Sequence, residues 1–387
     1  MGDPAFVALS HLNVGLHQLY PREEVSFEFF HDDITPDLSQ AQFIYLGTPQ
    51  SLKQISGVER AAKRLKGPES FVVTTTHKDG RAIGFILGAD QRGMIYGVSA
   101  LMRKLGYGYT LDGDIVPHPR EEPFDFKDWD LADHPLVPRR FVFNWHNFLS
   151  GCSSWDLDHW QKWITQSQKM GYNGLMLHAY GNNPMTGFSF KGEDKPVGYL
   201  SSTRIGRDWA TMRVNDVRRL VGGEVFTRPV LGSTAAIDGT DRQRTEAAQK
   251  LMADVFGYAD GRDFDVILAV DLDTDSANPQ KLITLLPESA RFETNKSSHF
   301  WLPRCNTPEG YGYYKAQLAH LLEVYPQNGH DRVVDAAGSH ARHFAETGKP
   351  SGPVATAVQR DRQRQTRSQK VLAQRSYIRV GQDRRGA

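Results

Sequence analysis

Three aspartates recur at every second residue directly after an apolar run: Asp271, Asp273 and Asp275. Carboxylates at the end of a buried strand can bind hydroxyl groups or act as an acid and a base. Cleavage of a glycosidic bond needs two carboxylates roughly 5–10 Å apart. The spacing also resembles a calcium loop, but Ser276 stands where that loop requires Gly, and Leu282 stands where it requires Glu. We therefore predict Asp271 and Asp273 as catalytic candidates, and we predict no metal site.

Polar and aromatic side chains also follow two earlier apolar runs. Asn144 and Trp145 end the first run, and His178, Tyr180, Asn182 and Asn183 end or follow the second. An indole offers a flat face to sugar C–H groups, and amides can both donate to and accept from hydroxyls. We predict that these residues bind a substrate. Two structural alternatives stay open, because Trp145 could pack in the core and the Asn182–Asn183 pair could cap a loop.

The elements that must position these side chains alternate between strand and helix patterns. The strands are predicted at 140–145, 173–179, 264–271 and 331–334, and the helices at 156–170, 242–259 and 308–325. Nearly continuous apolar strands are typical of a parallel sheet covered on both faces. The alternation predicts an α/β sheet or barrel, with four strands where a (β/α)8 barrel has eight. The carboxyl ends of such strands carry the ligand sites.

The first part of the chain predicts a separate α+β domain. Its strands are expected at 25–30, 43–46, 70–76 and 82–87, with helices at 51–66 and from a Gly-rich corner to residue 105. Five prolines then mark a linker. The predicted domains are 1–117 (α+β), 118–138 (linker), 139–334 (the first half of a barrel) and 335–387 (a disordered tail).

Charge and composition exclude several classes of function. The chain of 387 residues has 46 Lys plus Arg and 45 Asp plus Glu, so it has no general attraction for nucleic acid or anionic membrane. Residues 335–387 hold 11 basic and 4 acidic side chains. We interpret this tail as solvated coil, and a nucleic-acid-binding arm is the alternative. The oligomeric state is left open.

Several motif classes are missing from the sequence. Two cysteines, Cys152 and Cys305, are too few for a disulfide framework, although one bridge remains an alternative. The corner from Gly88 to Gly93 lacks the G-x-G-x-x-G spacing, and H-E-x-x-H, C-x-x-C and G-x-S-x-G do not occur. We predict no cofactor. The first residues show no signal-peptide pattern and no apolar run of membrane-spanning length occurs, so the sequence leaves the localisation open.

Two stretches resemble known glycoside hydrolases. Residues 86–98 (ILGADQRGMIYGV) contain the pattern G-x-D-x-x-G-x-x-Y-G, which resembles the α/β domain that precedes the barrel in family 20 β-hexosaminidases and family 67 α-glucuronidases. Pro138, Arg140, Asn144 and Trp145, followed by 170–178 (MGYNGLMLH), are similar to the start of the barrel in these enzymes.

The resemblance implies a (β/α)8 glycosidase that acts on oligo- or polysaccharides by carboxylate acid/base catalysis. It adds Arg140 to the residues expected to line the sugar site, and it implies that the enzyme can be exported. In both families the catalytic carboxylates lie at the end of strand four or later, often as an Asp-Glu pair, and no such pair follows Val334. Two alternatives follow from this departure: either Asp271 and Asp273 take over the chemistry, or the chain is a catalytically incomplete carbohydrate-binding fragment of a truncated barrel.

Overall fold

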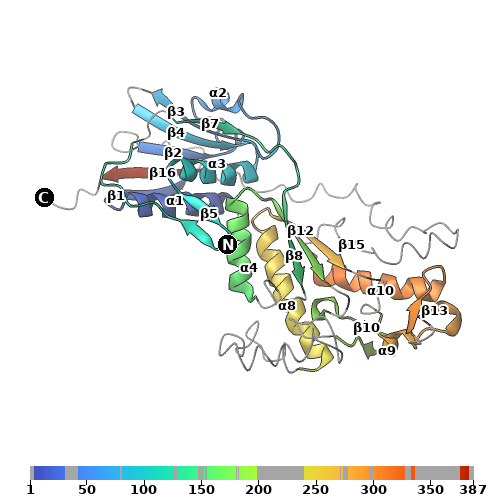
Figure 1. Ribbon diagram of the computed structural model, residues 1–387. Coiled ribbons are helices and arrows are strands. Elements are labelled where there is room, and N and C mark those ends of the chain that lie inside the picture. The colour runs from blue at the N-terminus through green and yellow to red at the C-terminus, as the bar shows by residue number, and fades with distance from the viewer. Residues whose placement is uncertain are drawn as a thin grey trace.

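The computed structural model describes two main sheets with helices packed against them (Figure 1). The residues it describes are 4–30, 42–78, 81–125, 129–146, 152, 155–179, 181, 183–197, 239–270, 272, 278–295, 300–326, 333–335 and 375–382. Among these residues, no helix is both long and apolar enough to cross a membrane.

The first sheet has six strands in the order β1-β16-β2-β4-β3-β7. The strands are β1 (Glu23–Phe30), β2 (Gln42–Gly47), β3 (Phe71–Lys78), β4 (Arg81–Gly88), β7 (Asp130–Asp133) and β16 (Arg375–Gln382). Helices α1 (Pro4–Leu19) and α3 (Gln91–Lys104) pack against each other and against this sheet. The strands expected at 70–76 and 82–87 form β3 and β4, which pair antiparallel from Phe71–Gly88 to Lys78–Arg81.

The helix predicted at 51–66 is shorter in the structure. Only Val58–Ala62 form helix α2, and the residues before it form turns. The Ser51 and Thr48 side chains hold the first turn, since each backbone N–H donates to the other residue's hydroxyl. Gly57 then adopts a left-handed φ of 95°, which a helix interior does not allow.

The predicted linker at 118–138 contains strand β7, which pairs with β3 at the sheet edge. Trp129 is buried just before this strand and packs edge-on against Phe124, with ring centroids 6.1 Å apart. Its backbone N–H donates to Thr75 Oγ1 at 3.1 Å. The prolines led to the prediction of a linker, but the buried pair of Phe124 and Trp129 anchors part of this segment to the sheet.

The prediction of a disordered tail is wrong for residues 375–382, which form β16. This strand pairs antiparallel with β1 on one side and with β2 on the other. Strands β1 and β2 follow each other in the sequence but do not pair in this sheet, so the edge of each is available to another strand. A pairing across more than 300 residues leaves no local signal in the sequence, which is why periodicity missed it.

Three smaller pairs of strands lie outside the two main sheets in the described part of the chain, and β10 (Ser189–Phe190) with β11 (Glu193–Asp194) is the first of them. Two more follow. One is β5 (Gly108–Thr110) with β6 (Gly113–Ile115), and the other is β13 (Arg291–Asn295) with β14 (Phe300–Pro303). The linking segments also form the helices α9 (Gln280–Ile283) and η4 (Glu288–Ala290).

The second main sheet has four parallel strands in the order β15-β12-β9-β8. Its strands and helices are β8 (Phe141–His146), α4 (Leu157–Lys169), β9 (Gly174–Ala179), α8 (Asp241–Asp260), β12 (Asp265–Val270), α10 (Pro308–Val324) and β15 (Val333–Asp335). The predicted alternation is therefore confirmed element by element. The described strands form an open sheet, so the barrel remains an inference from the order of the strands.

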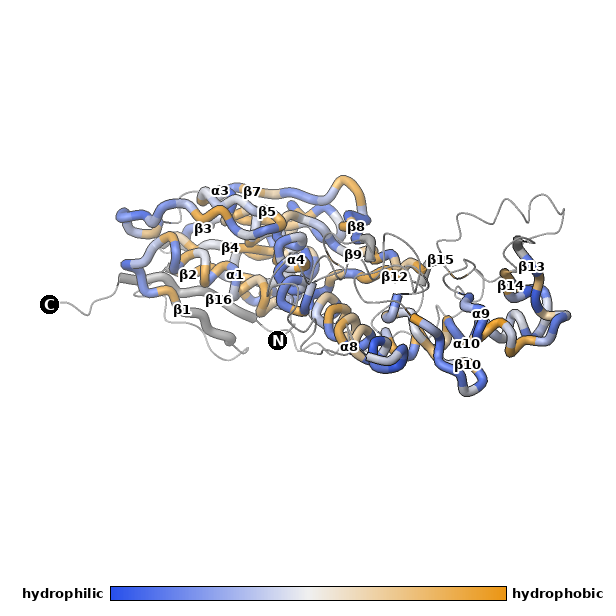
Figure 2. Tube along the Cα trace, turned by 60° about the horizontal axis from the view of Figure 1, so that its bottom comes forward, coloured by the Kyte–Doolittle hydropathy of each residue, from blue (hydrophilic) through white to orange (hydrophobic). Residues whose placement is uncertain are grey.

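A single hydrophobic core lies between this sheet and its helices. It contains Leu175 and Leu177 of β9 together with Trp160 of α4 and Phe256 of α8. Along α8 the apolar residues recur at helical spacing, and Figure 2 shows apolar and polar stretches alternating along its tube. The Thr240 side chain caps the helix in a capping box with Gln243. Packing of one face of the strands against the helices thus fixes the orientation of the sheet and the face on which each strand-end residue lies.

Candidate functional site

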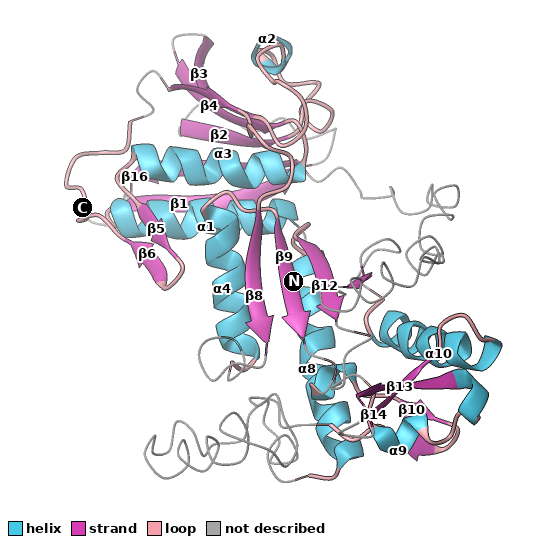
Figure 3. Ribbon diagram, turned by 45° about the vertical axis from the view of Figure 1, so that its right-hand side comes forward, coloured by secondary structure: helices cyan, strands magenta, loops and turns pink. Residues whose placement is uncertain are grey.

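The parallel sheet has two edges with different chemistry. Figure 3 shows the arrowheads of β8, β9 and β12 pointing away from the N-terminal sheet, so the carboxyl ends of these strands lie on the far side. The amino ends face the N-terminal domain. We describe the carboxyl edge first, because parallel sheets bind ligands there.

Strand pairing brings the predicted residues of β8 and β9 to the same level. Trp145 is the register partner of His178, and His178 is the partner of Ala269 in β12. His178 is 7% exposed and alternates with Leu177 and Ala179, which face the helices. It therefore lies on the sheet face opposite the helices.

Asn144 lies near the same carboxyl edge of the sheet, but on the opposite face from His178. Its register partner is Leu177, and a hydrogen bond from the Asn144 side chain contacts Cys152, which belongs to the core under the helices. Burial nevertheless raises the pKa of the Cys152 thiol to about 12. Since successive strand residues point to opposite faces, the structure separates Asn144 from His178.

The loop after β9 is ordered by Asn183. This residue is fully buried, and its Oδ1 accepts a hydrogen bond from Met185 N at 2.9 Å. It thereby caps the short 3₁₀ helix η2 (Pro184–Thr186). The capping alternative is confirmed for Asn183. Tyr180 and Asn182 lie outside the described residues.

The predicted catalytic pair also lies outside the described residues, since neither Asp271 nor Asp273 is among them. Strand β12 ends at Val270, directly before Asp271. In the register, Val270 pairs with Asp335, the last residue of β15. Sequence reasoning missed Asp335 because it ended the strand one residue earlier. The end of the fourth strand therefore does carry a carboxylate.

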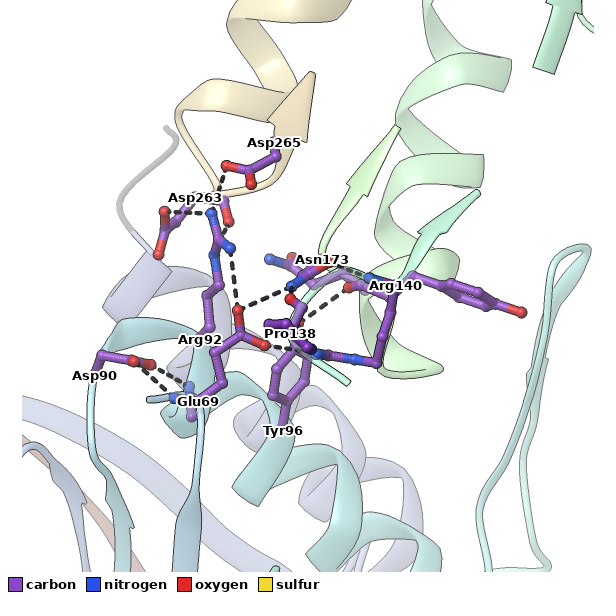
Figure 4. Close-up of polar contacts among 12 residues, drawn as sticks. Glu69, Asp90, Arg92, Tyr96, Pro138, Arg140, Asn173, Asp263 and Asp265 are labelled. Atoms are coloured by element: carbon purple, nitrogen blue, oxygen red, sulfur yellow. Dashed lines mark hydrogen bonds and ion pairs between the residues drawn. The ribbon is translucent and has the colours of Figure 1, made fainter. Parts of the chain in front are cut away.

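Arg140 lies at the opposite edge, directly before β8. Its side chain binds Glu69, whose carboxylate also accepts from Arg92 Nη1 at 3.1 Å and from Asn173 Nδ2 at 2.9 Å (Figure 4). Its Nη2 also donates to Tyr96 Oη at 3.2 Å. Arg140 is thus part of a cluster between the two domains, and the structure does not bring it together with His178.

The same cluster explains the sequence motif of residues 88–97. Asp90 Oδ1 accepts from Gly93 N at 2.9 Å and its Oδ2 accepts from Glu69 N at 2.7 Å. A Cβ atom on Gly93 would lie 2.3 Å from the Ser70 carbonyl oxygen, so only glycine fits there. The turn at residues 88–93 therefore places Glu69 and Arg92 where their side chains contact Asn173 and Asp263 of the second domain.

The electrostatics of this cluster favour the charged forms. Burial alone would raise the pKa of Glu69, but hydrogen bonds from Arg140 and Asn173 outweigh it and hold this pKa below its ordinary value. Burial also opposes the charge on Arg92, yet Asp263 and Asp265 keep the pKa of its guanidinium above the ordinary value. Arg92 Nη2 lies 3.0 Å from Asp263 Oδ1 and 2.8 Å from Asp265 Oδ1. Glu69 and Arg92 are therefore held as ions, and their contacts dock the two domains.

The loop beyond η2 holds a buried lysine. It forms the hairpin of β10 (Ser189–Phe190) and β11 (Glu193–Asp194), and Lys195 follows directly. Lys195 is 1% exposed, and its Nζ lies 5.6 Å from the centre of the Phe188 ring. Burial lowers the pKa of this amine to about 7. Nothing in the sequence singles out Lys195, because no motif or periodicity marks it.

Metal and disulfide chemistry find no support among the described residues. No group of three or more His, Cys, Asp or Glu side chains in these ranges is placed to hold a metal ion. Neither Cys152 nor Cys305 forms a disulfide, so the alternative of one bridge is not realised.

Comparisons with known proteins give weak likenesses. No protein-family model matches the sequence, and no curated protein matches it either. The GH20 beta-N-acetylhexosaminidase from Streptomyces coelicolor A3(2) is similar in structure over 67% of this chain, with 15% identity and a TM-score of 0.35. The family 89 glycoside hydrolase from Clostridium perfringens is similar in its complex with PUGNAc over 74% of this chain (12% identity, TM-score 0.40) and in its complex with 2-acetamido-1,2-dideoxynojirmycin over 75% (13%, 0.41). The chain spans 44% of the length of the first of these structures and 32% of the other two.

Proposed function

We propose that this protein is a carbohydrate-active protein of the glycoside hydrolase type, with its sugar site at the carboxyl edge of the parallel sheet. The observation that carries the proposal is the register at this edge. It aligns Trp145 with His178, and it aligns the last residue of β12 with Asp335. An aromatic residue and an imidazole residue are thus neighbours at the edge where parallel sheets bind ligands, whereas Asp335 is level with Val270, which packs on the helix side. The sequence motifs shared with hexosaminidases and glucuronidases supply the class of reaction.

The proposed roles follow from chemistry and position. His178 would hydrogen-bond a sugar hydroxyl, since an imidazole can both donate and accept. Asp271 and Asp273 are the candidate acid and base, and their separation would decide whether hydrolysis retains or inverts the anomeric configuration. Arg140 and Asn144 are left out of the pocket, because one lies at the amino edge and the other hydrogen-bonds Cys152 on the helix side.

We expect the protein to release 4-nitrophenol from at least one of the α- and β-4-nitrophenyl glycosides of N-acetylglucosamine, glucuronic acid and glucose. His178→Ala should lower kcat/KM at least tenfold, a loss of about 1.4 kcal/mol of transition-state stabilisation. The exposed His134, which lies near β7, gives the matched control His134→Ala. Circular dichroism of both variants separates this loss from misfolding.

The outcome also decides the second candidate function. Calorimetric binding of a glycoside without release would indicate a catalytically incomplete carbohydrate-binding protein, which the absence of an Asp-Glu pair after strand four favours. Neither binding nor release for any glycoside would refute both versions of the proposal.

A further inference from the structure

A cavity of about 680 Å³ lies away from the carboxyl edge, between the N-terminal domain and the helices of the second domain. Residues of α1, α4 and α8 line it, and α4 and α8 run side by side (Figures 1 and 3). Small-molecule sites typically enclose about 300–1,000 Å³, so a ligand of one or two sugar units would fit.

Most charged side chains that line this cavity are already paired. Lys169 Nζ lies 2.6 Å from Asp114 Oδ2, and Asp254 Oδ2 lies 2.7 Å from Lys250 Nζ, which is outside the cavity wall. Each of these charges is therefore neutralised by a neighbour.

Arg262 is the exception among the described residues that line the cavity. Arg262 is only 9% exposed, and its Nε atom has no hydrogen-bond partner among the described residues. The guanidinium forms no ion pair with any described carboxylate and stacks on Tyr258, with Cζ 5.1 Å from the ring centre. Burial lowers the pKa of Arg262. A buried charge is normally paired, and no described carboxylate supplies that pair to Arg262.

Two polar side chains with buried atoms, Gln168 and His11, support the wall around Arg262. Further polar groups that line the cavity come from Ser10, Gln18 and Gln161. Gln168 is 1% exposed, and its Nε2 donates to the Arg262 carbonyl at 2.8 Å, which leaves Oε1 without a partner. His11 contacts Tyr109 Oη through Nε2 at 3.0 Å, and its Nδ1 is unpaired. Burial lowers the pKa of His11 to about 3, so at pH 7 this ring is neutral and adds no competing cation.

We propose that this cavity binds a small hydroxylated carboxylate, of the kind represented by a sugar acid. The Arg262 guanidinium binds the carboxylate, and the polar side chains of Ser10, Gln18 and Gln161, which also line the cavity, bind hydroxyls. Phe6 and Val14 of α1, which are 41% and 51% exposed, cover the apolar side of the ligand. The inference does not depend on the proposed glycosidase function, because the cavity shares no residue with the carboxyl edge.

Titration calorimetry with D-glucuronate tests the proposal. We expect saturable binding of one equivalent, and at least tenfold weaker binding of D-glucose and of inorganic phosphate. Arg262→Gln should weaken the binding of D-glucuronate at least tenfold. This variant should keep its thermal stability, because it removes an unpaired buried charge.

Two exposed valines give a matched pair of variants. Val14→Trp fills the cavity and should abolish binding, whereas Val116→Trp, at a 45% exposed valine outside the cavity, should leave it unchanged. The proposal is overturned by any of three results: no binding of D-glucuronate, undiminished binding by Arg262→Gln or Val14→Trp, or equally tight binding of phosphate.

Discussion

Replacing Glu69 with alanine is expected to lower the free energy of unfolding by about 3–5 kcal/mol. Glu69 is 8% exposed and accepts hydrogen bonds from Arg92, Arg140 and Asn173. Its removal leaves two guanidinium groups at the domain junction without their shared carboxylate. Glu69 also adopts a left-handed φ of 61°, which a non-glycine residue rarely does, so its side chain must compensate for that backbone cost. Urea denaturation at pH 7 measures the loss.

The effect should depend on pH in a defined direction. The folded-state pKa of Glu69 lies below its ordinary value, so its contribution is present above about pH 4.3 and is lost as the pH falls through the folded-state pKa. The difference between the wild-type protein and Glu69→Ala should therefore shrink below about pH 4. The control is Glu59→Ala, which breaks an exposed pair with Lys63 and should cost less than about 1 kcal/mol. Equal effects of the two substitutions would argue against a docking role for Glu69.

Replacing Lys195 with methionine is expected to stabilise the protein. The Lys195 amine is buried and has no hydrogen-bond partner among the described residues, and burial lowers its pKa from 10.5 to about 7. Between these two values the unfolded chain binds more protons than the folded one, so the stability of the wild-type protein rises with pH. Below pH 7 the full penalty of about 5 kcal/mol applies. Methionine fills a similar space without a charge.

Unfolding free energies at pH 6, 8 and 10 test this prediction. The advantage of Lys195→Met should be largest at pH 6 and should nearly vanish at pH 10. Lys315→Met removes an exposed lysine of α10 and should change little at any of the three values. A destabilised Lys195→Met variant, or an advantage that does not vary with pH, would show that the amine is stabilised by its surroundings.

The elements of the parallel sheet could be predicted from the sequence because their signals are local. The apolar runs that became β9 and β12 and the periodic pattern of α8 each depend on residues close together in the chain. The insertion of β16 between β1 and β2 could not be predicted, since it joins segments from opposite ends of the chain.

The candidate site was predictable only in part, for a related reason. Sequence order places Asn144, Trp145 and His178 at strand ends, but the pairing register decides which of them share a face. A shift of one residue moves a side chain to the other face, and this separates Asn144 from His178. Arg140 was placed by resemblance alone, and its position before the strand puts it at the amino edge.

Hydrogen–deuterium exchange locates the sugar site most directly. The protein is measured alone and with the 4-nitrophenyl glycoside that binds or reacts best in the panel. The account predicts that the glycoside slows exchange at the ends of β8, β9 and β12, around Trp145, His178 and Val270. Slower exchange at the amino edge around Arg140 instead, or no change in any strand of the parallel sheet, would contradict a sugar site at the carboxyl edge.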